Sequence, residues 1–446
     1  MVNYLNINKL TYGEPYALYR KVIWVYLFLL IFEGALRKWF LPSLATPLLI
    51  VRDPIAIWLT IVGWKKGWLK NGYVEIMMIA STVSFFLTLL VGHHNLLVAL
   101  FGWRIYFFHF PMIFVMGRIL SRTDILKIGR FILWISIPMT VLIVVQFYSP
   151  QTAWVNLGVG GEGTAGFGGA LGYMRPPGTF SFIAGYVAFQ AVACCYLLYY
   201  LVMNDTLPAK YRFSNITLMV LVACYLLSIP MSIARTHFFQ TCVILFFFGV
   251  AIIRKENLKK NFFKFIFLVF IACIVLAITG IADMGLDAFT VRFEGANESE
   301  GGLEGVLGNR YLGGFIRGLM GFDIPWFGYG IGLGTNAGSH MMGGTIYSFG
   351  FNGEVEWERI VGECGIIIGW AIVGVRLLFS LKLCRVTYMK MLRCYDLLPW
   401  MLSAGMMLTV PQGQWATPTN LGFSILLGGL TLAAIKGHSV NKVTID

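Results

Sequence analysis

Charged residues are scarce in this chain. Asp, Glu, Lys and Arg together make up 12% of its 446 residues, whereas hydrophobic residues make up 58% and aromatic residues 15%. Soluble domains carry charge at about twice this frequency, so the composition excludes an ordinary soluble enzyme or binding domain. The mean hydropathy of +0.74 and repeated apolar runs of about 20 residues predict an all-α polytopic membrane protein.

Other familiar signals are missing too. None of the eight cysteines lies in a long predicted outer loop or has zinc-ligand spacing, so we expect neither disulfides nor a zinc site. The glycine-rich run that ends at Gly178 is not followed by Gly-Lys-Ser or Gly-Lys-Thr, which excludes a Walker phosphate loop. The first span lacks a short apolar region with a cleavage site, so we expect an anchor rather than a signal peptide.

The apolar runs predict about twelve spans, and the last two are short enough that eleven would also fit. They lie near residues 22–41, 46–63, 73–91, 95–117, 131–149, 179–203, 214–233, 236–253, 262–281, 360–381, 397–410 and 419–435. We expect three parts in the chain. These are an N-terminal bundle (1–281) with a glycine-rich outer loop at 150–178, a large outer loop (282–359), and C-terminal spans with a short tail (360–446).

The net charge of +13 does not indicate nucleic-acid binding, because the basic residues gather in alternate short loops. Under the positive-inside rule these loops and both termini are cytoplasmic, and the long loops 150–178 and 282–359 face outward. On the predicted outer side the only lysine is Lys38, yet several arginines occur there. We therefore expect the outward arginines to serve contacts rather than topology.

Five arginines are candidates for binding an anionic substrate group: Arg104, Arg175, Arg235, Arg310 and Arg317. Guanidinium groups keep their charge and bind phosphates through two parallel hydrogen bonds. Arg310 and Arg317 are seven residues apart, which places them on one face of a helix. Each arginine also has a simpler interpretation, as half of an ion pair with a nearby carboxylate or as an anchor at lipid headgroups.

Further charges lie in the first two spans, where Glu33, Arg37, Arg52 and Asp53 occur in apolar surroundings. A charge inside a bilayer is costly, so such residues pair with each other or line a cavity. For Glu33 with an arginine, or Arg52 with Asp53, the sequence favours a structural ion pair over a substrate contact.

The carboxylates of the large outer loop cluster just before the tenth predicted span. Glu354 and Glu358 are four residues apart and would share one helix face. Arg359 follows Glu356 by three residues and precedes Glu363 by four, so it is expected to pair with one of them. Glu354 and Glu358 are then the freer carboxylates, and His340 is a further candidate base in a glycine-rich stretch.

Four short motifs occur in the order found in a known family: Arg175-Pro-Pro-Gly-Thr-Phe, Ser232-Ile-Ala-Arg235, Asn309-Arg310 followed by Pro325-Trp-Phe-Gly328-Tyr-Gly330, and Glu363-Cys-Gly365-Ile-Ile-Ile-Gly369. They are similar to the Arg-x-x-Gly-x-Phe, Ser-x-x-Arg, Arg…Pro-x-x-Gly-x-Gly and Glu-x-Gly-x-x-x-Gly motifs of the O-antigen polymerase/ligase superfamily, also called Wzy/WaaL. The chain also resembles this family in its number of spans and in the large outer loop before the last of them.

The resemblance implies a glycosyltransferase of the bacterial inner membrane, whose donor is a glycan on undecaprenyl diphosphate. A hydroxyl of an acceptor glycan would attack the anomeric carbon of the donor, and the lipid diphosphate would leave. The arginines would stabilise the leaving group, so no metal or cofactor is expected, and Glu354 would act as general base. Ligases of the family carry a His-Asn pair at the position of Glu354-Val355, so either Glu354 replaces that histidine or His340 supplies the base.

Polymerisation of O-antigen, capsule or exopolysaccharide is the preferred reaction. A ligase or oligosaccharyltransferase, which moves the glycan to lipid A core or to protein, would use the same donor. A flippase or exporter of lipid-linked oligosaccharides is the alternative from another class, but it would be expected to have short loops on both sides. Expected partners are the lipid-linked donor, the acceptor glycan and the bilayer, with a flippase and a chain-length regulator as further candidates and no nucleic acid.

The predicted orientation can be tested by cysteine labelling. Ser299→Cys in the outer loop should react with a membrane-impermeant thiol reagent in intact cells, because the loop charges place it outside. Ser439→Cys in the C-terminal tail should react only after the cells are lysed. Labelling of the tail but not of the loop in intact cells would reverse the orientation.

Overall fold

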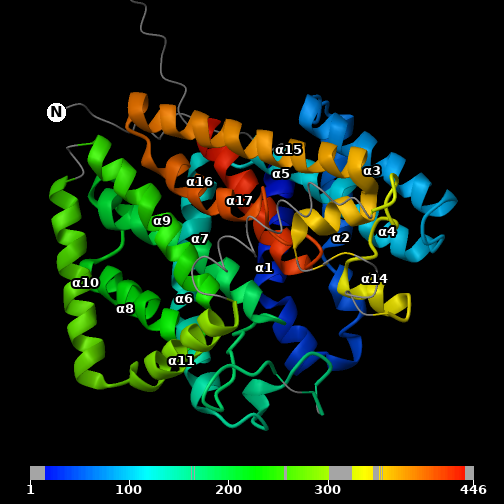
Figure 1. Cartoon of the computed structure of the whole chain (residues 1–446). Coiled ribbons are helices and arrows are strands. Elements are labelled where there is room, and N and C mark those ends of the chain that lie inside the picture. Colours follow the sequence, from blue (N-terminus) through cyan, green and yellow to red (C-terminus); the bar gives the residue numbers. More distant parts are fainter. Residues whose placement is uncertain are drawn as a thin grey trace, which may run out of the picture.

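The computed structural model describes residues 16–161, 163–164, 166–255, 259–300, 324–344, 351, 353 and 355–436. Within these ranges the regular structure is helical, which confirms the predicted all-α class, and two isolated β-bridges lie in the glycine-rich loop. Figure 1 shows a bundle whose helices run in several directions around a central group. The main helices are α1 (Ala17–Ala35), α2 (Asp53–Lys65), α3 (Gly72–Leu90), α4 (Leu96–Arg104), α5 (Phe110–Ile119), α6 (Arg122–Tyr148), α7 (Ile183–Met203), α8 (Asn215–Met231), α9 (Arg235–Arg254), α10 (Lys259–Thr279), α11 (Asp283–Glu300), α14 (Asn336–Met341), α15 (Glu356–Cys394), α16 (Leu397–Thr409) and α17 (Pro418–Lys436).

Short helical segments join several of these elements. A π-helical segment, η3 (Leu36–Phe40), extends α1, and another, η6 (Ile105–His109), joins α4 to α5. Single 3₁₀ turns form η4 (Pro42–Leu44), η5 (Pro47–Ile50), η7 (Trp154–Asn156), η8 (Asn204–Thr206) and η9 (Ala209–Tyr211).

Each of the predicted spans contains a helix, but fewer helices qualify as spans than predicted. Among the described residues, nine helices are long and apolar enough to cross a membrane, or ten if the bent α10–α11 pair counts as one span. Helix α16 has only 13 residues, and α1 carries Arg20, Lys21 and Glu33. The structure therefore supports a multi-pass membrane protein with nine or ten clear spans in the part of the chain that it describes, and the count of twelve stays a prediction.

Helix starts follow from local capping residues. Ser121 and Asp124 form a capping box at the start of α6, in which each side chain accepts a hydrogen bond from the other residue's backbone N–H. Asn71 and Asn95 cap α3 and α4 through their side-chain oxygens. Such caps satisfy backbone N–H groups that the first turn of a helix leaves without partners.

Helix α7 is the centre of the bundle. In its apolar stretch 94% of the residues are buried, compared with 33% in α9. It packs against α6, α8, α9, α10, α16 and α17. A helix that is apolar on all sides belongs inside a helical protein rather than at its lipid-facing surface, and α7 occupies that place.

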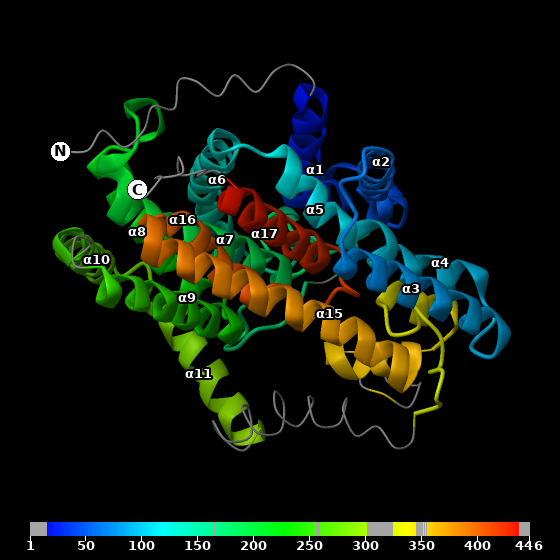
Figure 2. The same cartoon turned by 90° about the horizontal axis from the view of Figure 1, so that it is seen from above.

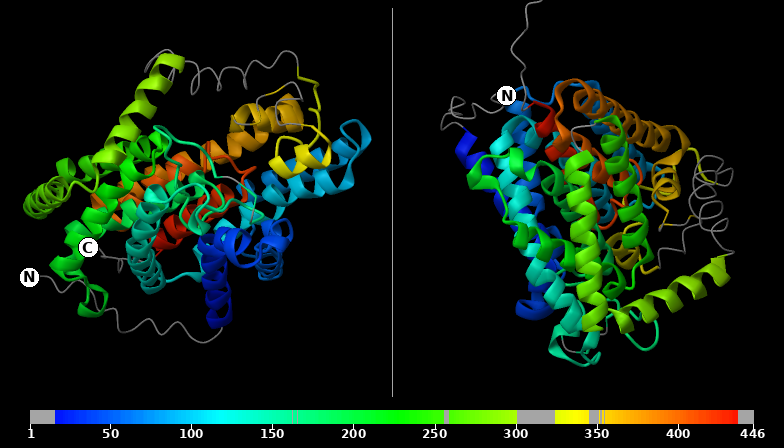
Figure 3. Two further views of the ribbon diagram at one scale, coloured as in Figure 1. Left: turned by 90° about the horizontal axis from the view of Figure 1, so that it is seen from below. Right: turned by 90° about the vertical axis from the view of Figure 1, so that its left-hand side faces the viewer.

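Helix α11 leaves the bundle axis sharply. It makes an angle of 101° with the second part of α10 and lies across the end of α8 (Figure 3). Phe289 and Phe293 of α11 pack against Phe238 and Phe239 in the first turns of α9, with ring centroids 6.0–6.4 Å apart. The aromatic contacts fix the start of the predicted outer loop against the bundle.

Helix α15 is broken at Gly365. This residue has a φ of +79°, and a β-carbon on it would lie 2.1 Å from the carbonyl oxygen of Trp326. The chain segment 326–330 therefore packs directly against the backbone of α15 at the break. Figure 2 shows the first part of α15 lying beside α3, α4 and α14 at one edge of the bundle.

We predict that Gly365→Ala destabilises the protein by about 1–3 kcal/mol, because alanine disfavours the positive φ and its methyl group meets the Trp326 carbonyl. Thermal unfolding of the purified protein in detergent measures this. Gly374→Ala on the same helix is the matched control, since no atom lies within 4 Å of a β-carbon there. Equal melting temperatures for the two variants would contradict the packing at the break.

Candidate functional site

The segments predicted to face outward gather on one side of the bundle. The glycine-rich loop between α6 and α7, the segment from η3 to η5 and α11 lie along the lower side in Figure 1, and α14 lies at the right-hand edge. The polar chemistry described below comes from two groups of residues, an arginine group near α9 and α11 and an ionic cluster at the start of α15.

Arg175 lies in the last part of the glycine-rich loop and is half-buried. Its Nε donates a hydrogen bond to the Gly168 carbonyl, at 3.1 Å. Burial lowers the pKa of the Arg175 guanidinium, and the nearby Arg292 of α11 lowers it further. Two cationic groups from separate elements therefore lie close together on the predicted outer side.

Arg235 is the first residue of α9. This helix and the segment before it contact the elements that carry Arg175 and Arg292. A β-carbon built at Gly169 would lie 2.9 Å from Ile233 Cδ1 and 3.4 Å from Arg175 Cγ, so the segment before α9 touches the loop. The aromatic contacts between α9 and α11 bring in the element that carries Arg292. We call Arg175, Arg235 and Arg292 the arginine rim.

Helix α1 holds the chain just after Arg175 in place. Lys38 Nζ donates to the Gly178 carbonyl at 2.7 Å, and the Thr179 hydroxyl donates to the Ile31 carbonyl at 2.6 Å. A β-carbon on Gly34 would lie 2.3 Å from the backbone nitrogen of Ser181, so only glycine permits this close approach. The part of the glycine-rich loop that carries Arg175 is therefore attached to α1 and η3 through segment 178–181.

Arg104 lies deeper, in a buried ionic group. Its Nη1 forms an ion pair with Asp53 at 2.6 Å, and His109 Nε2 contacts the same carboxylate oxygen at 3.0 Å. Beside this group, Arg52 Nε pairs with Glu33 at 2.9 Å, which confirms the expected Glu33–arginine ion pair. Because Asp53 already balances its charge, Arg104 does not need a substrate to account for its burial.

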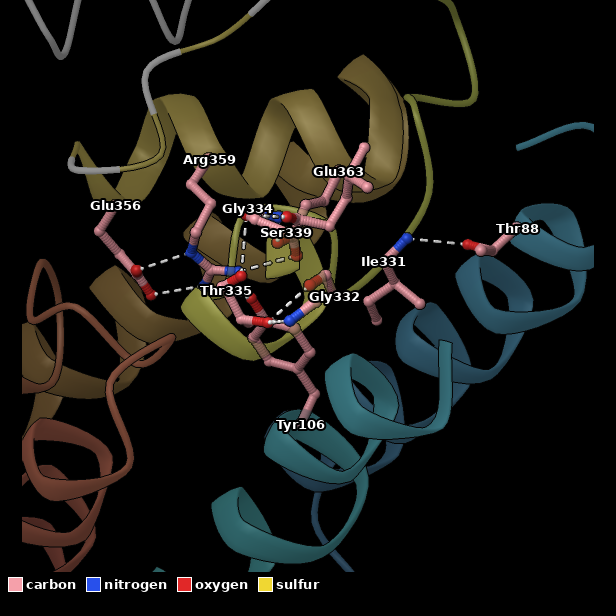
Figure 4. Close-up of polar contacts among 12 residues, drawn as sticks. Thr88, Tyr106, Ile331, Gly332, Gly334, Thr335, Ser339, Glu356, Arg359 and Glu363 are labelled. Atoms are coloured by element: carbon pink, nitrogen blue, oxygen red, sulfur yellow. Dashed lines mark hydrogen bonds and ion pairs between the residues drawn. The ribbon is translucent and has the colours of Figure 1, made fainter. Parts of the chain in front are cut away.

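The start of α15 carries a fully buried ionic cluster, drawn in part in Figure 4. Arg359 pairs with Glu356 at 3.0 Å and with Glu363 at 2.7 Å, and its Nη2 donates to the Tyr106 hydroxyl at 3.0 Å. The expected pairing of Arg359 with one of these glutamates is thus confirmed, and it extends to both. Arg376 also pairs with Glu356 and donates to the Val410 carbonyl at 2.8 Å.

The glycine-rich turn before α14 is anchored on this cluster (Figure 4). Glu363 Oε1 accepts from the Gly334 N–H at 2.8 Å, and its backbone carbonyl accepts from the Gly330 N–H at 3.0 Å. On the other side, the Ile331 N–H donates to Thr88 Oγ1 at 2.8 Å. The turn leads into α14, where His340 is exposed.

The predicted site residues that the structure describes therefore lie in different parts of it and do not form one site. Arg175 and Arg235 belong to the arginine rim, and Arg104 lies in a buried ion pair. His340 lies on α14, and Glu358 lies half-buried in the first turn of α15. Three predicted residues lie outside the described residues: Arg310, Arg317 and Glu354.

Two arginines that the structure brings forward were not candidates from the sequence. Arg292 is the only basic residue in 283–304, and its isolation among acidic residues was the available signal. Arg376 lies inside an apolar run, where a charge generally has a buried partner or a function.

No family model and no curated protein matches this chain. A functional assignment therefore depends on the motifs of the chain and on the geometry described above.

We predict that Glu363→Gln lowers the free energy of unfolding by about 3–5 kcal/mol, the cost of breaking a buried ion pair. The amide keeps the shape of the side chain, but its NH₂ group must face either the Arg359 guanidinium or the Gly334 N–H, which are both donors. Denaturation of the purified protein in mixed micelles measures the change. Glu75→Gln, at an exposed carboxylate near the start of α3, should stay within about 0.5 kcal/mol of the wild type. A Glu363→Gln protein as stable as this control would contradict the structural role of the cluster.

Proposed function

We propose that this protein is an inner-membrane glycosyltransferase of the O-antigen polymerase/ligase type, which polymerises glycan repeat units carried on undecaprenyl diphosphate. The observation that carries the proposal is the arginine rim. Arg175 of the glycine-rich loop and Arg292 of α11 interact electrostatically, and Arg235 begins α9, whose preceding segment contacts the same loop. Cations held close together repel one another, and a bound polyanion removes that repulsion.

A lipid-linked diphosphate suits this place for two further reasons. The first turn of α9 adds N–H groups and the positive end of a helix dipole to the three side chains. The rim also borders the ends of apolar helices, so a polyprenyl chain would stay in the lipid while its diphosphate reached the arginines. In the proposed reaction, these charges stabilise the diphosphate as its bond to the anomeric carbon breaks.

The acceptor must lose a proton as the new glycosidic bond forms. We propose a carboxylate near the start of α15 as the base, with Glu354 preferred and Glu358 one turn further on. His340 on α14 is the competing base, since its exposed imidazole lies on the element that the glycine turn positions. A general base in this role contributes about 10²–10⁴-fold to the rate.

Polymerase and ligase reactions share the donor and differ in the product that a deletion strain accumulates. Loss of a polymerase should leave single repeat units on the lipid or on the final acceptor. Loss of a ligase should leave long lipid-linked polymer that never reaches the outer-membrane acceptor. A deletion strain with an unchanged glycan profile would contradict both reactions.

Complementation of this strain tests the arginine rim. We expect three substitutions to lower glycan synthesis about 10–100-fold: Arg175→Lys, Arg292→Lys and, in the predicted outer loop, Arg310→Lys. The reason is that lysine cannot form the bidentate hydrogen bonds that arginine forms with phosphate. Arg130→Lys, on α6 near the Arg212 carbonyl, is the control and should complement fully. Protein levels in the membrane fraction must match the wild type.

Full complementation by both rim variants would refute the diphosphate role. Loss of the variant proteins from the membrane would instead favour a purely structural role for these arginines.

A further inference from the structure

A cavity of about 340 Å³ lies between the end of α6 and the tip of the glycine-rich loop. Residues 147–151 form one wall and residues 171–174 the other. Its volume is at the lower end of the range of about 300–1,000 Å³ that is typical of small-ligand sites. The wall that ends at Met174 adjoins Arg175 of the arginine rim.

One part of the cavity lining is aromatic and another part is polar. Phe147 is buried and stacks on Tyr173, with ring centroids 4.3 Å apart and planes 7° from parallel. Ser149 and Gln151 add a hydroxyl and an exposed amide. Tyr148 donates a hydrogen bond to the Ile281 carbonyl, which ties this wall to the segment that enters α11.

The second wall is held by a tight hairpin turn. The Tyr173 N–H donates to the Ala170 carbonyl at 2.9 Å, and Leu171 and Gly172 between them have φ values of +52° and +79°. A leucine rarely adopts this left-handed conformation, and here the turn leaves its side chain 58% exposed at the edge of the cavity. The hairpin thus keeps Tyr173 in the cavity wall, and it does so with Leu171 in an unfavourable left-handed backbone conformation.

The lining chemistry selects the type of ligand. The described residues that line the cavity include no charged side chain, so a phosphate group would find no counter-charge there. A lipid chain would not use the hydroxyl and amide groups. A sugar ring fits both parts, because its C–H face packs on an aromatic ring while its hydroxyl groups bond to polar atoms.

The position of the cavity relative to Arg175 indicates which sugar of the lipid-linked donor would bind there. Tyr173 and Arg175 are two residues apart, and the backbone around Met174 pairs with Gly168 as in a short strand. Residues two apart in a strand lie on the same face, about 7 Å from each other. A sugar bonded directly to a diphosphate at Arg175 would therefore reach Tyr173.

We propose that this cavity binds the first sugar of the lipid-linked donor, the ring that is bonded to the diphosphate. The proposal rests on the proposed function, because it places the diphosphate at the arginine rim. The face of Tyr173 that does not stack on Phe147 supplies the packing surface, and Gln151 supplies a hydrogen bond to a ring hydroxyl. The cavity then distinguishes a glycan-bearing lipid from the bare lipid diphosphate that leaves after transfer.

The test compares two probes on the purified protein in lipid nanodiscs. One is undecaprenyl diphosphate, and the other is the lipid-linked glycan extracted from the deletion strain. The wild type should bind the glycan-bearing probe about tenfold more tightly. Tyr173→Leu should remove this preference without changing the affinity for undecaprenyl diphosphate, whereas Tyr173→Phe should keep most of it. Arg175→Lys should weaken the binding of both probes.

The remaining outcomes distinguish an error in the proposed sugar site from an error in the proposed function. A Tyr173→Leu protein that keeps the preference overturns the sugar site and leaves the proposed function intact. Equal weakening of both probes by Tyr173→Leu assigns the cavity to the prenyl chain and overturns the sugar site. Failure of the wild type to bind either probe overturns the proposed function and the sugar site together. If Tyr173→Leu does not fold, Gln151→Ala decides, with a several-fold loss of the preference expected from its exposed position.

Discussion

Arg359 has no solvent-exposed surface, and the carboxylates of Glu356 and Glu363 lie on either side of its guanidinium. A buried charge that loses its partner costs several kcal/mol, so these groups stay together or the region does not fold. Each glutamate also holds another segment. Glu356 binds Arg376, which donates to backbone carbonyls between α16 and α17, and Glu363 accepts from Gly334 in the glycine turn. Three segments, the start of α15, the chain between α16 and α17 and the glycine turn, therefore depend on one buried cluster.

A second buried ionic group, which η6 joins to the first through the Arg359–Tyr106 hydrogen bond, follows the same rule. Asp53 at the start of α2 binds Arg104 of α4 and His109 of η6, while Glu33 of α1 binds Arg52 just before α2. These pairs fix α1 against its neighbours at the level where α1 meets segment 178–181. The loop that carries Arg175 is thus attached to a helix whose own position is set by buried charge. Both buried ionic groups therefore hold elements next to the proposed site by ion pairs within apolar surroundings.

The sequence predicted what local patterns determine. Apolar runs predicted a helix in every span, and the three- and four-residue spacings around Arg359 predicted its pairing, because both depend on neighbours along one helix. Contacts between distant segments were not predictable in this way. The partner of Arg104 is 51 residues away, and Arg292 meets Arg175 only because α11 turns by 101° from the end of α10. Nothing in the composition of α10 or α11 encodes that angle.

The arginines fall into two kinds, buried and half-buried, which differ in how readily they could bind an anion. Arg52, Arg104 and Arg359 are buried beside carboxylates, so each would have to break an ion pair before it could bind an anion. Arg175 and Arg292 are half-buried and come from a loop and a helix near the surface, where they raise the local positive potential together. Catalysis of group transfer needs charges that are fixed before the reaction begins. In the proposed reaction the buried pairs provide that rigidity, and the rim arginines, whose positions depend on it, provide the charge that the leaving diphosphate meets.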